Sequence, residues 1–272
     1  MKINRVNTNY LNSSFKQESA AITLQRRFRS MLKKTFNSDC LNQTYLKKHK
    51  NESSKAKKLT ITQVDFNKKK NRRLIRSCVQ KWQEFVHHKL HRAEKNPKRY
   101  SKEFVGKLRS YGTVFSCLQP DLKGANGMDF FIAKDEKNIQ GICVAKKVEK
   151  DSAVWKIDEL MSSPINAHKK YRGQTHVEGV GPALIAHTAL QSHADAMKSG
   201  GTEQKDRAMV VLISSGGSDP FYEHLGFNEY DGDDETLTPI RDTCTFDRYL
   251  RGEELRLLLR KYGARAEKGA HC

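Results

Sequence analysis

The order of the hydrophobic patterns between residues 59 and 227 constrains the fold of this chain most strongly. Each segment is identified by the period of its apolar residues, which is two in a strand and 3.6 in a helix. Strands are expected at 59–66, 129–134, 139–147, 153–162 and 208–214, and helices at 71–91, after Pro97 and at 182–198. The second and third strands are separated by a four-residue polar turn and should form a hairpin. The order predicts an α/β domain whose sheet contains both antiparallel and parallel strands.

The C-terminal part continues with a strand expected near 243–249 and a helix expected over 252–261. The helix at 182–198 carries His187 and His193, which we expect to be surface residues without a chemical role. No spacing of histidines or cysteines indicates a metal site.

The charge of the chain is divided unevenly along its 272 residues. Residues 1–110 contain 29 Lys and Arg against 7 Asp and Glu, whereas residues 111–272 contain 21 against 24. Such a division indicates an interaction arm or an anion-binding face. Nucleic acid, an acidic protein and a membrane surface all fit as partners. We therefore divide the chain into a basic arm (1–57), a catalytic domain (58–250) and a C-terminal helix and tail (251–272).

The arm contains one expected helix, 19–36, in which apolar and basic residues alternate at helical spacing. Its central segment resembles a calmodulin-binding IQ motif through Leu24, Gln25, Phe28, Arg29 and Lys34. A basic amphipathic helix suits the Met-rich acidic groove of calmodulin. It suits anionic lipid or RNA nearly as well, and packing onto its own domain is a further alternative.

The six cysteines occur singly, without a Cys-x-x-Cys pair, so a reducing compartment is the simpler interpretation. No stretch approaches the roughly 18 apolar residues of a membrane-spanning helix. We therefore expect a cytoplasmic protein without a transmembrane segment. The first 19 residues are rich in Asn, Ser and Thr and resemble the leader of a bacterial type III secretion effector, which implies delivery into a host cell as an alternative.

Three short motifs follow in order after residue 155. The first is Asp158-Glu159-Leu160-Met161-Ser162, near the end of the strand at 153–162. The second is a glycine-bearing turn before the helix, His176-Val177-Glu178-Gly179-Val180-Gly181, preceded by Arg172 and followed by Pro182, which we expect to open the helix. The third runs from Ser215 and Ser218 through Phe221 and Tyr222 to Gly226 and Phe227. Glycines at a helix N-terminus allow a phosphate to approach free backbone N–H groups, so the second motif suits a pyrophosphate.

Together, the three motifs resemble those of the GNAT superfamily of acyl-CoA-dependent N-acyltransferases. The family carries an acidic-Leu-x-Val-x-Pro strand, a Gln/Arg-x-x-Gly-x-Gly/Ala turn and an Asn-x-x-Ala-x-x-Phe-Tyr-x-x-x-Gly-Phe segment. This chain departs from them, with Ser162 for Val, His176 for Gln/Arg, and Ser215 and Ser218 for Asn and Ala. Its turn is also longer than usual, so either Arg172 or His176 would face the phosphate.

The resemblance implies a splayed mixed sheet flanked by helices, with acetyl-CoA lying between the strands at 153–162 and 208–214. It implies coenzyme contacts from Leu160, Met161 and Ser162, from the turn, and from Ser215, Ser218, Phe221 and Tyr222. Tyr222 would be the general acid for the departing thiolate. A lysine amine of pKa about 10.4 costs roughly 4.6 kcal/mol to deprotonate at pH 7, so a general base is useful. Glu159 is the better candidate and Asp158 the second, because neighbours on a regular strand face opposite sides.

The expected function is transfer of an acetyl group from acetyl-CoA to a primary amine of a protein, either a lysine or an N-terminus. The amine would attack the thioester directly, with backbone N–H groups of the splayed strand stabilising the oxyanion. Two alternatives stay open. One is a toxin-like acetyltransferase of charged tRNA, in which the basic half binds RNA. The other is a catalytically silent acyl-CoA-binding protein that acts through its arm.

Overall fold

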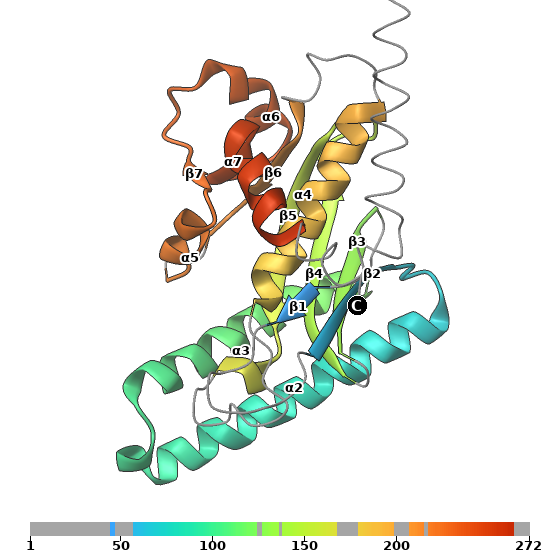
Figure 1. Ribbon diagram of the computed structural model, residues 1–272. Coiled ribbons are helices and arrows are strands. Elements are labelled where there is room, and N and C mark those ends of the chain that lie inside the picture. Colours follow the sequence, from blue (N-terminus) through green and yellow to red (C-terminus); the bar gives the residue numbers. More distant parts are fainter. Residues whose placement is uncertain are drawn as a thin grey trace, which may run out of the picture. The chain divides into compact units, whose positions relative to one another are not determined.

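An eight-stranded mixed sheet with the order β1-β2-β3-β4-β5-β6-β8-β7 forms the framework of the structure (Figure 1). The computed structural model describes residues 44–46, 57–123, 127–135, 138–167, 179–198, 207–214 and 217–263. The strands are β1 Thr44–Leu46, β2 Lys57–Val64, β3 Asp129–Lys134, β4 Ile139–Lys147, β5 Val154–Ser162, β6 Met209–Leu212, β7 Asn228–Glu229 and β8 Arg248–Arg251. Strands β5 and β6 are parallel, and the other paired strands are antiparallel. The mixed, helix-flanked fold class expected from the sequence is confirmed.

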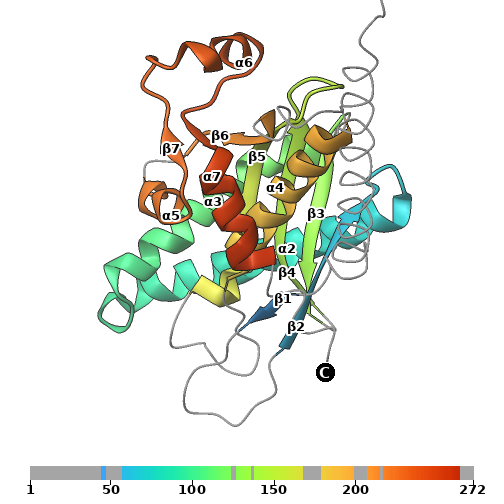
Figure 2. The same cartoon turned by 45° about the horizontal axis from the view of Figure 1, so that its top comes forward.

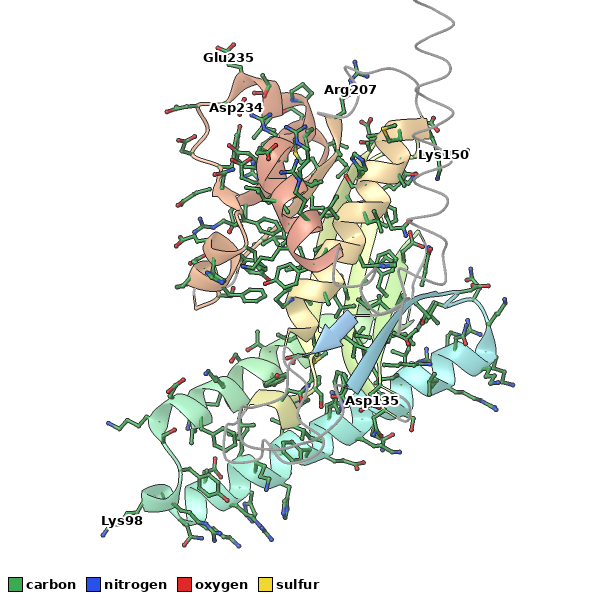
Figure 3. The ribbon with its side chains drawn as sticks, viewed as in Figure 1. Lys98, Asp135, Lys150, Arg207, Asp234 and Glu235 are labelled. Atoms are coloured by element: carbon green, nitrogen blue, oxygen red, sulfur yellow. The ribbon has the colours of Figure 1, made fainter. Side chains whose placement is uncertain are left out.

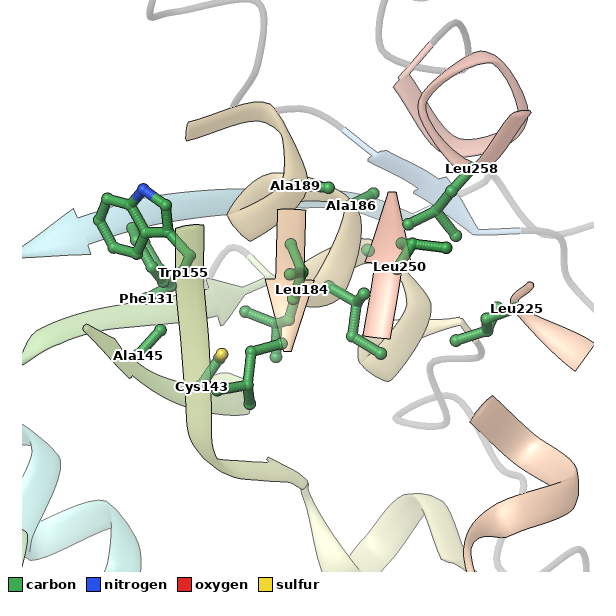
Figure 4. Packing of buried hydrophobic residues seen from close by; sticks show 14 of the residues in the cluster. Phe131, Cys143, Ala145, Trp155, Leu184, Ala186, Ala189, Leu225, Leu250 and Leu258 are labelled. Atoms are coloured by element: carbon green, nitrogen blue, oxygen red, sulfur yellow. The ribbon is translucent and has the colours of Figure 1, made fainter. Parts of the chain in front are cut away.

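Helices cover both faces of this sheet (Figure 2). They are α2 Lys69–Lys95, α3 Lys102–Lys123, α4 Val180–Lys198, α5 Asp219–His224, α6 Thr238–Thr243 and α7 Gly252–Leu258, with short turns η1 Pro97–Arg99, η2 Pro164–Ala167, η5 Glu235–Leu237 and η6 Leu259–Gly263. On one face, Leu184 of α4 and Leu258 of α7 share a core with Phe131 and Trp155 (Figure 4). On the other face, α2 and α3 pack against Phe130 and the remaining apolar side chains of β3 and β4. Within the described residues, no helix has the length and apolar character needed to cross a membrane.

The hairpin expected from the sequence is confirmed residue for residue by β3 and β4. Two other boundaries were wrong. Helix α4 begins at Val180, not at Pro182, because the Gly179 carbonyl already accepts the Ala183 N–H at 3.0 Å. Within the range 243–249, residue 243 is the end of helix α6, which has a proline in its first turn, and the strand begins only at Arg248.

The parallel pair β5–β6 is short. Its register runs through four residue pairs, from Val154 opposite Met209 to Ile157 opposite Leu212. Beyond this point β6 ends, whereas β5 continues to Ser162 and stays paired with β4. The two strands therefore part at Ile157, and the later residues of β5 have no partner from β6.

The paired end of these strands is held by a buried serine of α4. Ser192 Oγ donates to the Ala153 carbonyl at 2.6 Å and accepts the Met209 N–H at 2.8 Å. One hydroxyl thus links the starts of β5 and β6 to the helix above them. Nearby, Asp195 accepts the Trp155 indole N–H at 3.1 Å and forms ion pairs with Lys147 at 2.9 Å and Lys198 at 3.0 Å.

Helix α4 lies unusually close to strand β4. A Cβ atom added to Gly141 would stand 2.3 Å from Val180 Cγ1 and 2.9 Å from Leu184 Cδ1. Such distances are well inside van der Waals contact, so only glycine fits without movement of the helix. The first turn of α4 is therefore pressed directly onto the sheet.

His187 is buried, which corrects the expectation that it lies on the surface. Its side chain is 7% exposed and packs edge-on against Phe131 at 5.0 Å between ring centroids. Neither ring nitrogen has a hydrogen-bond partner among the described residues. Burial lowers the pKa of His187 to about 4 because a charged imidazolium has no solvation there.

This burial predicts an acid-dependent loss of stability. The unfolded chain takes up a proton at His187 near pH 6.5, but the folded chain does so only near pH 4, so stability falls as pH drops through this window. The full shift corresponds to about 3 kcal/mol. We expect wild type to lose that much more stability than His187→Phe between pH 7 and pH 4 in urea unfolding. Parallel pH profiles for the two proteins would contradict this assignment.

Candidate functional site

The first turn of α4 presents backbone N–H groups that have no acceptor within the helix, beside the gap between β5 and β6. Gly179 has a φ of 76°, a left-handed conformation that favours glycine, and its carbonyl begins the helix. Val180 and Gly181 occupy the first turn, where N–H groups have no acceptor within the helix, and Pro182 has no N–H at all. Two donors therefore point outward at the positive end of a 19-residue helix.

Gly181 is the contact point between this turn and α5. A Cβ atom there would lie 3.2 Å from Cζ of Phe221 and 4.0 Å from Cδ2 of Leu160. The turn, strand β5 and helix α5 thus converge on one residue. This convergence brings together the three motifs that the sequence placed up to 60 residues apart.

Tyr222 is held in place by the way α5 ends. The Phe227 N–H donates to the Tyr222 carbonyl at 3.0 Å, and the Gly226 N–H donates to the Glu223 carbonyl at 2.9 Å. With Gly226 at a φ of 90°, this is a Schellman motif, and its usual apolar contact is the Tyr222–Phe227 ring pair at 5.5 Å. The Phe-Tyr-x-x-x-Gly-Phe pattern is therefore a helix end that fixes the tyrosine ring.

The Tyr222 phenol stays protonated across the physiological range. Burial, together with the nearby Cys143, Glu159, Asp247 and Asp219, raises its pKa to about 12. Its hydroxyl makes no hydrogen bond to another described residue. Tyr222 is therefore a donor without a partner in a site that is only partly exposed to solvent.

Arg248 of β8 anchors α5 from the sheet. Its buried guanidinium forms ion pairs with Asp219 at 3.1 Å, Glu223 at 3.6 Å and Glu229 at 3.5 Å. Asp219 also accepts the Ser214 hydroxyl, and this hydrogen bond together with Arg248 lowers the Asp219 pKa. The sequence reasoning missed Arg248, for which no local pattern exists. The Asp219-Pro220 pair, typical of a helix start, was the available signal for Asp219.

The two candidate carboxylates lie at a β-bulge. Glu159 stands opposite Val144 and Ile157 stands opposite Ala145, which leaves Asp158 as the extra residue of β5. Both carboxylates therefore occupy the place opposite Val144, on the face that α2 and α3 cover. The expectation that neighbouring residues of this strand face opposite sides of the sheet is therefore wrong for Asp158 and Glu159.

Asp158 forms ion pairs with two lysines. Asp158 is 17% exposed and lies 3.1 Å from the Lys146 ammonium and 3.3 Å from that of Lys156. These two contacts tie the Asp158 side chain to β4 and to its own strand.

The other expected site residues differ in what they can offer. Met161 is 3% exposed and belongs to the core under α2 and α3, so only its backbone is available to a ligand. Ser162 Oγ lies 3.3 Å from the Tyr111 hydroxyl. Ser218 starts α5 through its carbonyl, which accepts the Phe221 N–H at 3.0 Å. Exposed apolar surface is also present near the gap, where Ile213 is 54% and Phe221 36% exposed.

Several expected residues lie outside the described part of the chain. They are Arg172, His176, Val177 and Glu178 of the turn, Ser215, and the IQ-like residues Leu24, Gln25, Phe28, Arg29 and Lys34. Among the described residues, no group of three His, Cys, Asp or Glu side chains is placed to hold a metal ion.

Comparison with known proteins finds likeness in structure only. No protein-family model matches the chain, and no curated protein matches its sequence. A PaiA N-acetyltransferase from Thermoplasma acidophilum with bound coenzyme A is 14% identical with a TM-score of 0.36, over 71% of this chain and 99% of that one. An acetyltransferase from Streptococcus agalactiae 2603 is 15% identical with a TM-score of 0.32, over 65% and 87%. An aminoglycoside acetyltransferase from an uncultured soil metagenomic sample, with bound sisomicin, is 16% identical with a TM-score of 0.27, over 61% and 84%. Likenesses this weak do not assign an activity.

Proposed function

We propose that this protein is a GNAT-type N-acetyltransferase that uses acetyl-CoA as co-substrate. The observation that carries the proposal is the parting of β5 and β6 at Ile157, with the first turn of α4 and Tyr222 beside the gap. The free N–H groups of Val180 and Gly181 suit the pyrophosphate of the coenzyme. The apolar surface of Ile213 and Phe221 suits its uncharged pantetheine part.

The proposed reaction is direct attack of a neutral amine on the thioester carbonyl. Glu159, on the α2–α3 face, takes the amine proton directly or through a water molecule. Backbone N–H groups of β5 beyond Ile157, which lack a partner from β6, stabilise the oxyanion. The C–S bond then breaks, and the sulfur leaves as a thiolate next to Tyr222.

The role of Tyr222 follows from its pKa of about 12. A thiol has a pKa near 8.5, so full transfer of the phenol proton to the thiolate is uphill by about 3.5 units. Tyr222 therefore contributes chiefly a hydrogen bond that stabilises the departing sulfur, with protonation following as the product leaves. This role differs from that of the general acid expected from the sequence, which would transfer its proton fully to the thiolate.

Coenzyme binding at the turn is tested by a pair of variants that differ only in charge. Gly181→Glu and Gly181→Gln both displace the Phe221 ring, but Glu alone places a carboxylate beside the pyrophosphate. We expect calorimetry on the folded proteins to give an acetyl-CoA affinity at least about tenfold lower for Glu than for Gln, or roughly 1.4 kcal/mol. Equal affinities would exclude this turn as the phosphate site and, with it, the proposed function.

Turnover measurements distinguish the role of Tyr222 from that of Glu159. Tyr222→Phe keeps the ring and should leave coenzyme affinity nearly intact while lowering kcat by roughly 100-fold to 1,000-fold, the usual cost of losing one hydrogen-bond donor to developing negative charge. Because the Tyr222 pKa is raised to about 12, the wild-type rate should show no alkaline limb from this group below about pH 11. Glu159→Gln should lower the rate most at low pH, where neutral amine is scarcest. A normal rate for Tyr222→Phe, or greater damage from Asp158→Asn than from Glu159→Gln, would refute these roles.

For the acceptor, we propose a primary amine of a protein, a lysine or an N-terminus, and we propose the cytoplasm as the place of action, in the producing cell or in a host cell. Acetylation of lysates of bacterial and eukaryotic origin with labelled acetyl-CoA tests both proposals. A label found in low-molecular-weight material alone would argue against a protein acceptor.

We further propose that the arm docks calmodulin or a similar acidic partner through its IQ-like residues. Because β1 pairs with β2, the truncation belongs after Leu41, where the compact unit Asn42–Cys272 begins. Removing residues 1–41 should abolish calmodulin capture and keep acetyl-CoA binding. Phe28→Asp should act like the deletion, whereas Arg26→Ala should cost less. Equal capture by truncated and full-length protein would exclude this role of the arm.

A second candidate acceptor, an amine carried on RNA, is favoured by the charge of the α2–α3 layer. Residues 69–123 contain fifteen Lys and Arg against four Asp and Glu. Many of these cations are exposed, among them Lys98 on the connection between the helices (Figure 3). A charged-tRNA acceptor would show binding that weakens steeply with salt, and charge reversal at Arg92 and Lys98 would flatten that slope. Salt-independent binding would leave a protein as the acceptor.

A further inference from the structure

A cavity of about 570 Å³ lies between the first half of α2, the β3–β4 turn and η2. This volume is within the range of small-molecule sites, roughly 300–1,000 Å³. Its apolar wall consists of Leu74, Trp82, Phe85, Ile139 and Ile165. None of the residues assigned to acetyl transfer lines it, so this cavity is separate from the gap between β5 and β6.

The polar side of the cavity is built from groups that satisfy one another. The Asp135 carboxylate accepts hydrogen bonds from the backbone N–H of Asn138 at 2.6 Å and from the side-chain amide of Gln140 at 2.7 Å. Figure 3 shows the position of Asp135. Gln140 in turn accepts the Asn166 amide at 3.1 Å, and its carbonyl accepts the Ser163 N–H at 2.7 Å. These bonds tie the hairpin turn to η2, so the cavity is preformed and the carboxylate is already engaged.

Two lysines give this cavity its charge. Lys81 and Lys134 both line it, and neither forms an ion pair with another described residue. Both are close enough to the Cys78 thiol to favour its ionisation, but burial outweighs them and raises the Cys78 pKa to about 12. The thiol is therefore uncharged and does not neutralise the lysines. Among the described lining residues, the two lysines outnumber the single carboxylate of Asp135, so the cavity carries a net positive charge.

We infer that this cavity binds a small amphipathic anion, a carboxylate on an aromatic or alkyl body. The carboxylate would lie between Lys81 and Lys134 and the apolar body against Trp82 and Phe85. The same charges disfavour a protonated amine, which separates this ligand from the acetyl acceptor. The inference does not depend on the proposed acetyltransferase activity.

The test compares 4-phenylbutyrate with its neutral amide, 4-phenylbutanamide, by calorimetry on the full-length protein. The carboxylate should bind at least about tenfold more tightly, because both probes fill the cavity but only one is charged. Lys134→Gln and Lys81→Gln should each weaken 4-phenylbutyrate binding several-fold and leave the amide unchanged. Lys98→Gln, an exposed lysine that does not line the cavity, is the matched control. Ser77→Trp, at an exposed lining position, should block both probes without disturbing the core.

The outcomes that would overturn the inference are distinct from a failure of the acetyltransferase proposal. They are equal binding of the two probes, equal loss in Lys98→Gln, or no saturable binding of either probe. Competition between 4-phenylbutyrate and acetyl-CoA would place the probe in the gap between β5 and β6 and would also refute a separate site. Additive binding of the two supports it, whether or not the protein transfers acetyl groups.

Discussion

The short parallel contact between β5 and β6 is the constraint on which the rest of the site depends. Its four residue pairs are fixed at one end by Ser192, whose hydroxyl joins both strands to α4. Because the pairing ends at Ile157, the backbone of β5 has no partner on its β6 side where the motif carboxylates follow, although it stays paired with β4. A longer β6 would close this gap with ladder hydrogen bonds. The opening between β5 and β6 is therefore a consequence of a strand that stops early.

Each of the groups beside the gap is held by a different structural element. The bulge at Asp158 belongs to the β4–β5 ladder, the free N–H groups belong to α4, and Tyr222 belongs to α5, which Arg248 attaches to β8. A bulge re-aims side chains locally, whereas a buried guanidinium holds a whole helix. The position of Tyr222 is thus set from the far side of β6, by a residue that no ligand in the gap needs to touch.

Much of the fold was predictable because periodicity reports burial. The β3–β4 hairpin and the order of elements followed from alternation and from apolar stripes. The misassigned strand near 243–249 shows the limit, since residue 243 is the end of helix α6 and the strand begins only at Arg248. The site was predictable as a set of motifs but not as a geometry. A bulge at Asp158 and a buried His187 both depend on neighbours from distant strands, which a single sequence does not pair.

The close contact between Gly141 and α4 affects how the start of this helix is held on the sheet. The missing side chain allows Val180, a residue of the first turn of α4, to rest on β4 itself. The Val180 and Leu184 side chains contact β4 at Gly141, where residue 141 places no side chain of its own between the strand and the helix. A methyl group at position 141 would overlap the Val180 and Leu184 side chains, so these side chains or the first turn of α4 would have to shift. The distance between this turn and the opening therefore depends on β4, the strand next to β5.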